Sequence, residues 1–305
     1  MTVSAPAPTG LSGADWEVDF YSRPVLEPDG RKRWDLLICA TPPVSPGGAQ
    51  PTSELSSFRF EKRCAAAAVN SQWLREALAE ALALAEREAQ PRPRRLRCWR
   101  GSMRPMVQRA AEALGLVVLP SRRCYRLSDG LGVRERELYP REEGYMAGPL
   151  APPLQPQRPV ALPWPEVVRG DRWSWATLPA SALGEAPEWS IGFAGLLRMP
   201  AGLSAHAQVP GIRLFSRRRA LALAGWLAGL EPVRLEVEQG QLVLEAGLDD
   251  RWRLATLSAN EATAARELFS RARQDSAGLQ FLAVQAGEED TRFEGFWMLR
   301  DLPDD

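Results

Sequence analysis

Apolar and aromatic residues recur in three short segments near the start of the chain. They span 16–23 (WEVDFYSR), 33–40 (RWDLLICA) and 58–63 (FRFEKR), with partial alternation of apolar and polar positions. Turn-forming residues, including Pro28, Asp29 and Gly30, separate the first two segments. This pattern predicts three consecutive antiparallel strands.

A helix is predicted next, from Asn70 to about Ala89. Asn70 can cap its first turn, and Leu74, Leu78 and Leu82 repeat at four-residue spacing, which predicts one buried helical face.

Two further crossovers complete the first half. The pattern predicts a short strand at 96–99, a helix capped by Ser102 with Pro105 in its first turn and Gly115 at its end, and a strand at 116–119. The resulting order is βββαβαβ. A meander followed by right-handed crossovers is the order of ribonuclease H-like domains, and this is the fold expected for the N-terminal half. Other α/β folds share this order, including a nuclease fold whose meander carries metal-binding acids.

The second half is predicted to be a mixed α+β domain. A helix from about Ser216, or from Ala220, to Leu230 precedes three strands, 233–238, 241–246 and 251–256. Ser258 and Glu261 have the spacing of a capping box and predict a helix to about Gln274. Two strands near 279–285 and 294–300 follow.

The chain length of 305 residues suggests two domains. Seven prolines lie between 149 and 165. Because proline has no backbone N–H to donate to a neighbouring strand, this segment favours an extended chain over a sheet. We therefore expect a flexible lead at 1–14, an N-terminal domain at 15–148, a Pro-rich linker at 149–165 and a C-terminal domain at 166–305.

Hydrophobic residues (45%) and charged residues (25%) are present at ordinary globular levels. The chain has no apolar run long enough to span a membrane, and its first residues lack the features of a secretory signal, so a cytoplasmic protein is expected. Four scattered cysteines and one histidine, His206, make a zinc site and a disulfide framework improbable. The cysteines are expected to be buried, and His206 to lie in a loop.

Positive charge is concentrated between Arg92 and Arg126. This segment holds ten arginines against one acid, Glu112, although the whole chain has a formal net charge of zero. Arginines neutralise phosphates and stack on bases, and Trp99 and Tyr125 add aromatic faces, a combination used to bind single-stranded RNA. The strands at 96–99 and 116–119 should be parallel, which would bring the loop at Arg100 close to Arg122 and Arg123.

Two other roles are open for this segment: a solvated face paired with acids elsewhere in the chain, or a docking surface for an acidic protein. A second basic patch, residues 217–219, lies in the first turn of the helix predicted from about Ser216, where cations oppose the helix dipole and an anionic partner would relieve the repulsion. If the helix begins at Ala220, the patch precedes it. The predicted RNA-binding residues are Arg94, Arg95, Arg97, Trp99, Arg100, Arg104, Arg122, Arg123, Tyr125, Arg217, Arg218 and Arg219.

Catalysis is not expected. A ribonuclease H-like or related nuclease gathers several carboxylates around metal ions. Asp19 is suitably placed on the first strand, and Glu76 or Glu80 could follow, but Trp99 and Arg100 stand where a third acid is needed. In the alternative nuclease arrangement, which would use Asp35 and Glu61, Lys62 would point to the wrong sheet face because it is adjacent to Glu61. Phosphate-loop and dinucleotide motifs are missing from the sequence, so catalytic residues, metals and cofactors are not predicted.

Several segments together resemble the Tab-two/Atab-two family of cyanobacteria, green algae and plant chloroplasts. They are WEVDFYSRP (16–24), RWDLLICA (33–40), FRFEK (58–62), VNSQWLREAL (69–78), LPSRRCY (119–125) and GFWMLRDLP (295–303). The resemblance spans nearly the whole chain. It implies an RNA-binding protein that supports synthesis of photosystem reaction-centre proteins, photosystem I foremost, through single-stranded mRNA regions and in contact with translation or photosystem-assembly proteins. The short Ala/Pro/Thr lead is similar to that of the bacterial, cytoplasmic members.

Two alternatives to RNA binding are a metal-dependent nuclease and a protein-assembly adaptor. An adaptor could use tryptophans of the second domain to hold its partner, although most of these are expected to be core residues. They are Trp173, Trp175, Trp189, Trp226 and Trp252.

Overall fold

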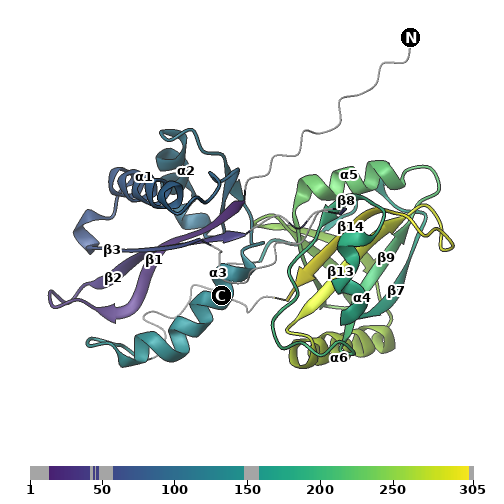
Figure 1. Cartoon of the computed structure of the whole chain (residues 1–305). Helices are drawn as coiled ribbons and strands as arrows, with labels where there is room; N and C mark the ends of the chain where they lie inside the picture. Colours follow the sequence, from purple (N-terminus) through teal and green to yellow (C-terminus); the bar gives the residue numbers. More distant parts are fainter. Residues whose placement is uncertain (1–13, 42–43, 45, 48–57, 148–157, 302–305) are drawn as a thin grey trace, which may run out of the picture. The chain divides into compact units, whose positions relative to one another are not determined.

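The structure is a computed structural model, and it describes residues 14–41, 44, 46–47, 58–147 and 158–301. By their backbone contacts these residues form two units. The first unit contains 14–41, 58–120 and 129–147, and the second contains 44, 46–47, 121–128 and 158–301 (Figure 1). Residues 121–128, assigned from the sequence to the first domain, thus cluster with the second unit. The expected lead and most of the Pro-rich linker lie outside the described residues.

The first unit is built on one five-stranded sheet. Its strands are β1 (Asp15–Leu26), β2 (Lys32–Thr41), β3 (Arg59–Cys64), β4 (Arg95–Cys98) and β5 (Val118–Pro120), arranged in the order β3-β2-β1-β4-β5. The pairs β1–β2 and β2–β3 are antiparallel, while β1–β4 and β4–β5 are parallel. The predicted meander and parallel crossovers are confirmed.

Two helices cover one face of this sheet (Figure 1). α1 (Ser71–Arg87) begins as predicted, because the side chain of Asn70 accepts a 2.8 Å hydrogen bond from the Trp73 backbone N–H. The prediction of Ser102 as the cap of α2 (Arg104–Glu112) is wrong. Ser102 lies inside a 3-10 turn, η3 (Gly101–Met103), whose carbonyl at Gly101 already accepts the N–H of Arg104, and α2 has no side-chain cap.

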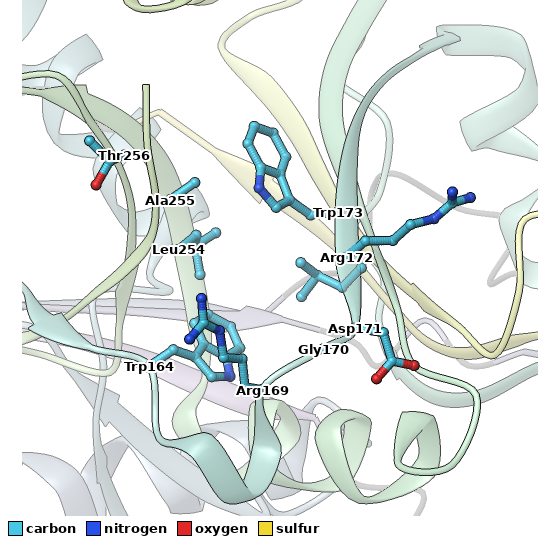
Figure 2. A pocket seen from close by; sticks show the side chains of 10 residues that line it. Trp164, Arg169, Gly170, Asp171, Arg172, Trp173, Leu254, Ala255 and Thr256 are labelled. Atoms are coloured by element: carbon cyan, nitrogen blue, oxygen red, sulfur yellow. The ribbon is translucent and has the colours of Figure 1, made fainter. Parts of the chain in front are cut away.

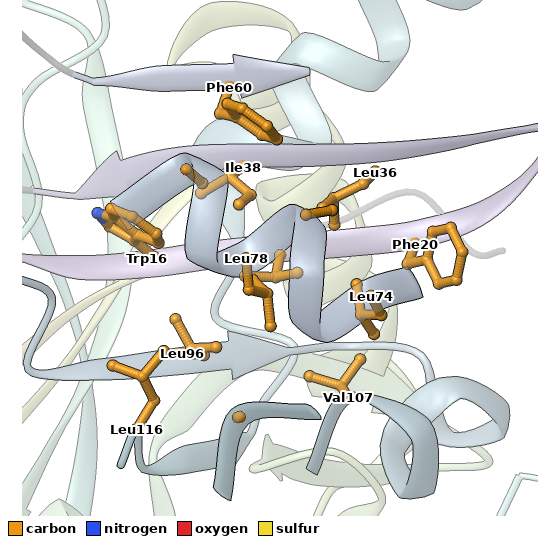
Figure 3. Close-up of a cluster of buried hydrophobic side chains, with 14 of the residues drawn as sticks. Trp16, Phe20, Leu36, Ile38, Phe60, Leu74, Leu78, Leu96, Val107 and Leu116 are labelled. Atoms are coloured by element: carbon orange, nitrogen blue, oxygen red, sulfur yellow. The ribbon is translucent and has the colours of Figure 1, made fainter. Parts of the chain in front are cut away.

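Figure 3 shows the core beneath these helices, in which Trp16, Phe20, Leu36 and Ile38 of the sheet meet Leu74 and Leu78 of α1 and Val107 of α2. Side chains alternate between the two faces of a strand, so Asp15, Glu17 and Asp19 are placed on the opposite face of β1. This polar face carries the charged groups described below. Cys64 and Cys98 are buried in the core, as expected for small apolar residues, and Cys124 is buried in the second unit, but Cys39, which was also expected to be buried, is partly exposed.

The second unit contains two sheets. One has the order β7-β9-β13-β14-β8 and the other the order β10-β11-β12-β6. Their strands are β6 (Leu162–Pro163), β7 (Arg172–Pro179), β8 (Ile191–Gly195), β9 (Gln208–Phe215), β10 (Pro232–Glu238), β11 (Gln241–Ala246), β12 (Asp250–Thr256), β13 (Leu279–Gln285) and β14 (Phe293–Arg300). The helices are α3 (Tyr125–Val133), α4 (Ala180–Gly184), α5 (Ala220–Leu230) and α6 (Ala259–Asp275), α3 continuing into the first unit. The second unit also has the short helical turns η6 (Glu166–Val168) and η7 (Ala186–Glu188), while η2 (Ala66–Ala68), η4 (Arg134–Leu138) and η5 (Tyr139–Arg141) belong to the first unit.

Most predictions for the second half are confirmed: the meander β10–β12, the capping box between Ser258 and Glu261, and the pair β13–β14. α5 begins at Ala220, the later of the two predicted starts. The mixed α/β class is also confirmed. No helix of the described residues is long and apolar enough to cross a membrane.

β9 was not predicted, because Pro210 and Gly211 resemble a loop signal. Pro210 lies in the ladder opposite Thr177 of β7, and a Cβ at position 211 would lie 2.4 Å from the carbonyl oxygen of Phe281. The glycine therefore permits close approach of β13 instead of marking a turn. His206 precedes this strand in an exposed turn, as predicted.

Candidate functional site

The polar face of the first sheet pairs acids of β1 with arginines of β4. Asp15 lies opposite Arg95 in the parallel ladder, and Glu17 lies opposite Arg97. Asp15, Glu17 and Asp19 are all buried. Much of the positive charge predicted for the segment 92–126 is therefore balanced by acids some 80 positions away, in agreement with one of the alternatives above.

Three arginines converge on Asp15. Arg94 Nε lies 3.2 Å from Oδ1, and Arg95 Nη2 and Arg97 Nη1 lie 3.0 Å and 2.7 Å from Oδ2. Burial alone would raise the pKa of Asp15, but the arginines, Arg97 foremost, outweigh it and hold the pKa below its ordinary value. One carboxylate cannot neutralise three guanidinium groups. Local positive charge remains, and the side chains of Arg94 and Arg95 are 36% and 28% exposed, against 9% for Arg97.

Asp19 lies further along β1 and has no exposed side-chain surface. Arg23 Nη1 donates to its Oδ2 at 2.8 Å, while Arg100 Nε and Trp99 Nε1 donate to its Oδ1 at 2.7 Å and 3.0 Å. Both carboxylate oxygens therefore accept hydrogen bonds, and two guanidinium groups balance the negative charge. Arg23 was not predicted to take part, although alternation along β1 places it on the face of Asp19.

The side chain of Arg100 is held in a fixed position, but only part of its guanidinium group is hydrogen-bonded. Its guanidinium carbon lies 4.1 Å from the ring centroid of Tyr21 and 4.3 Å from that of Trp99, so it contacts both aromatic rings while Nε is bonded to Asp19. Its side chain is 23% exposed. Its two terminal nitrogens donate no hydrogen bond to any described residue. The side chain of Arg104, at the start of α2, is exposed and makes no hydrogen bond or ion pair with any residue that the structure describes.

The other end of the basic segment is arranged differently. Arg123 is buried, and its Nη1 and Nη2 donate to the carbonyl oxygens of Pro232 and Gly195 at 2.7 Å and 2.6 Å. Tyr125 is only 4% exposed, and its hydroxyl donates to the carbonyl of Val233 at 2.7 Å.

Arg122, beside these residues, pairs with Glu245 at 2.9 Å. β4 and β5 are parallel as expected, but Arg122, Arg123 and Tyr125 attach residues 121–128 to the second unit. Both Nη atoms of Arg123, the hydroxyl of Tyr125 and Nη1 of Arg122 thereby have partners within that unit.

In the second basic patch, residues 217–219, only some of the polar groups have hydrogen-bond partners. Arg219 donates to the carbonyls of Glu166 and Val167, and the backbone N–H of Arg217 donates to Asp171 at 2.9 Å. The guanidinium groups of Arg217 and Arg218 are exposed and have no hydrogen bond to the described residues.

The remaining acids considered as metal ligands also have cationic partners. Asp35 is buried between Arg23 and Arg33, each with Nε at 3.5 Å, and burial raises its pKa despite these neighbours. Glu61 pairs with Arg134 of η4. Lys62 pairs with Glu80 of α1, on the helix face of the sheet, as its adjacency to Glu61 predicted. Among the described residues no group of three metal-ligating side chains comes together.

These features define a mixed α/β protein of two units, with half-exposed arginine and aromatic side chains of the kind that contact single-stranded nucleic acid. Residues 15–134 match the family model described as "RNA-binding protein Tab2/Atab2 N terminal", and residues 151–300 match the corresponding C-terminal domain.

Two curated relatives align over 95% of the chain. "Protein TAB2 homolog, chloroplastic" of Zea mays is 35% identical over 302 residues, which are 72% of its length, and the protein of the same name from Arabidopsis thaliana is 30% identical over 298 residues, 75% of its length. No solved structure gives a significant match. The chain belongs to the Tab2/Atab2 family of RNA-binding proteins.

Proposed function

We propose that this protein binds single-stranded regions of mRNA and thereby supports translation or biogenesis of photosystem reaction-centre proteins, chiefly those of photosystem I. Family membership supports the RNA partner, and the chloroplast relatives agree with a photosynthetic role. The proposal places the protein in the cytoplasm of a photosynthetic bacterium, where translation or photosystem-assembly proteins would be further partners.

The observation that carries the proposal is that the guanidinium group of Arg100 is fixed in position while its terminal nitrogens are free. Because Tyr21, Trp99 and Asp19 fix its guanidinium group, little side-chain entropy is lost when a ligand binds to the free terminal nitrogens. Two parallel N–H groups suit a phosphate oxygen pair. The half-buried ring of Trp99 offers a surface for an unpaired base.

Further cations extend this surface in two directions along the first unit. Arg104 lies on the helix that follows, and Arg94 and Arg95 lie at the other end of β4 with charge in excess of Asp15. Arg97, Arg123 and Tyr125 are buried, so in this proposal they position neighbouring groups and do not contact RNA directly.

The proposed role is non-catalytic. The sheet order β3-β2-β1-β4-β5 supports a ribonuclease H-like arrangement, in which Asp19 on the first strand would be expected to bind metal. Here two arginines and an indole N–H already satisfy that carboxylate, and a divalent ion would have to displace them.

Crosslinking in cells of the source organism, followed by sequencing of the bound RNA, tests the function. Enrichment of mRNAs for photosystem reaction-centre subunits is expected. If bound RNA is absent, or is spread evenly over all transcripts, the proposed role is wrong.

Incubation of the purified chain with RNA, DNA and hybrid substrates in magnesium or manganese tests the absence of catalysis. All substrates should remain intact. Metal-dependent cleavage that is lost in an Asp19→Asn variant would show a nuclease instead.

A further inference from the structure

The second unit contains a pocket of about 250 Å³ between the edge of β7 and the end of β12. Figure 2 shows Trp173 projecting from β7 toward Leu254 and Ala255 of β12, with Trp164 and Arg169 at one end of the pocket. The side chains of Asp171 and Arg172 point away from Leu254 and Ala255. Drug-sized sites usually measure roughly 300 to 1,000 Å³, so this pocket suits a smaller group, on the scale of one flat ring system.

Two half-buried indoles form its walls, and each packs against a second tryptophan ring. Trp164 contacts Trp226 edge to face with ring centroids 5.0 Å apart, and Trp173 contacts Trp175 in the same way at 5.2 Å. The indole N–H of Trp164 donates to the carbonyl of Val168 at 3.2 Å. Both rings therefore have a fixed orientation while part of each surface remains exposed to the pocket.

Cations surround this aromatic pocket. Arg169 lines it directly, and its guanidinium group makes no hydrogen bond or ion pair with any residue that the structure describes. The turn at 217–219 is attached to the same loop, because Arg217 N–H bonds to Asp171 and Arg219 bonds to the carbonyls of Glu166 and Val167. The free guanidinium groups of Arg217 and Arg218 are thus anchored close to the pocket.

The helix that follows increases the positive potential. α5 has no side-chain cap and no acid in its first turn, although three arginines precede it. Cations at a helix N-terminus repel the positive end of its dipole, and an anion relieves this repulsion. A flat ring between indoles with an anion beside arginines is the chemistry of a nucleotide.

We propose that this pocket is a second RNA contact: it receives one unpaired nucleobase against Trp173 and Trp164, and an adjoining phosphate binds Arg217, Arg218 and the start of α5. The inference rests on the proposed function, since it assumes that the chain binds single-stranded RNA. It assigns the second unit a direct part in that binding.

A thermodynamic cycle on the full chain tests the proposal. Binding of a short oligouridylate, and of an abasic oligomer of the same length, is measured by fluorescence anisotropy for the wild type and for Trp173→Ala. Loss of one base–aromatic stack weakens binding about 5- to 150-fold. Removal of the bases should therefore weaken binding less in Trp173→Ala than in the wild type, and Trp173→Phe should restore most of the difference.

A second variant changes only exposed residues, so it should not disturb the hydrophobic core. Arg217→Ala/Arg218→Ala removes two exposed side chains and should weaken binding of both oligomers and flatten its salt dependence, whereas Arg271→Ala, an exposed arginine of α6, should change neither.

The possible results separate the pocket from the general function. If the wild type binds neither oligomer, the proposed function fails and this inference fails with it. A second result would overturn only the pocket assignment. The wild type would bind the oligouridylate, Trp173→Ala would lose as much affinity as the wild type when the bases are removed, and the double arginine variant would bind as tightly as the wild type. Photocrosslinking of 4-thiouridine RNA to a peptide containing Trp164 or Trp173 supports it without any substitution.

Discussion

The two ends of the basic segment have nearly the same composition and opposite environments. One end reads Cys98-Trp99-Arg100, and the other reads Arg123-Cys124-Tyr125. At the first end, the arginine keeps its terminal nitrogens free while its Nε and its flat surface are engaged. At the second end, both terminal nitrogens of the arginine donate to backbone carbonyls, and so does the aromatic hydroxyl.

The comparison shows that the local partners of a guanidinium group, and not the number of arginines in a segment, determine whether it can bind a ligand. Backbone carbonyls that accept both terminal nitrogens hold an arginine in place, because separating them would leave a buried guanidinium group without hydrogen bonds, at a large cost in free energy. A carboxylate that takes only Nε leaves two donors for a partner. Substitutions at the two ends should therefore separate loss of stability from loss of RNA affinity.

The largest effect on stability is expected at Arg123. Arg123→Ala removes two charge-assisted hydrogen bonds, to the carbonyls of Pro232 and Gly195, which should lower the free energy of unfolding by about 3 kcal/mol or more. Urea denaturation followed by tryptophan fluorescence measures this loss. The exposed Arg109→Ala should remain within about 0.5 kcal/mol of wild type. Equal stability of the two variants would show that Arg123 has no structural role.

Trp99→Ala should weaken binding of single-stranded RNA by about 1 to 3 kcal/mol, with little change in the salt dependence. The indole also donates to Asp19, so thermal melting must accompany the titration. A variant that melts earlier but binds RNA with wild-type affinity would assign Trp99 to the fold alone.

Tyr125→Phe should have the opposite pattern. It removes the hydroxyl that donates to Val233 and should cost about 1 kcal/mol of stability, while RNA affinity stays unchanged. Weaker RNA binding by a folded Tyr125→Phe protein would contradict the distinction between the two ends.

Asp15 should make stability depend on pH. Its pKa lies below the ordinary value of 3.8 because three arginines stabilise the carboxylate. That contribution is complete above the unfolded-state pKa and is lost as the pH falls through the lower, folded-state pKa. Asp15→Asn should therefore be less stable than wild type at neutral pH, with a difference that narrows in acid. A difference that is constant with pH would exclude the arginine pairing as its cause.

Features encoded by neighbouring residues could be predicted from the sequence. The spacing of Leu74 and Leu78 gave the helix face of α1, and Ser258 with Glu261 gave the start of α6. The succession of strands and helices in the first half also followed from the sequence, together with its antiparallel meander and parallel crossovers.

Features that depend on distant partners could not be predicted in this way. Gly211 permits close approach of β13, some 70 positions away, and so resembled a loop residue. Arg123 and Tyr125 have partners more than 100 positions away, and nothing in their immediate surroundings distinguishes them from Arg100. For Arg95 and Arg97 the signal existed, because alternation along β1 and β4 places them on the face of Asp15, whereas Arg94 lies just before β4, where alternation gives no guide.

The salt dependence of RNA binding tests most directly whether the Trp99–Arg104 end of the segment is the RNA contact. Glutamine removes the charge at positions 100 and 104, and at position 100 it keeps a side-chain N–H donor near Asp19. Each lost single-strand phosphate contact flattens the log–log slope by about 0.7, so Arg100→Gln/Arg104→Gln should flatten it by about 1.4. Arg122→Gln, whose arginine pairs with Glu245, should leave the slope unchanged. An unchanged slope in the folded double variant, together with a flatter slope in Arg122→Gln, would contradict the account.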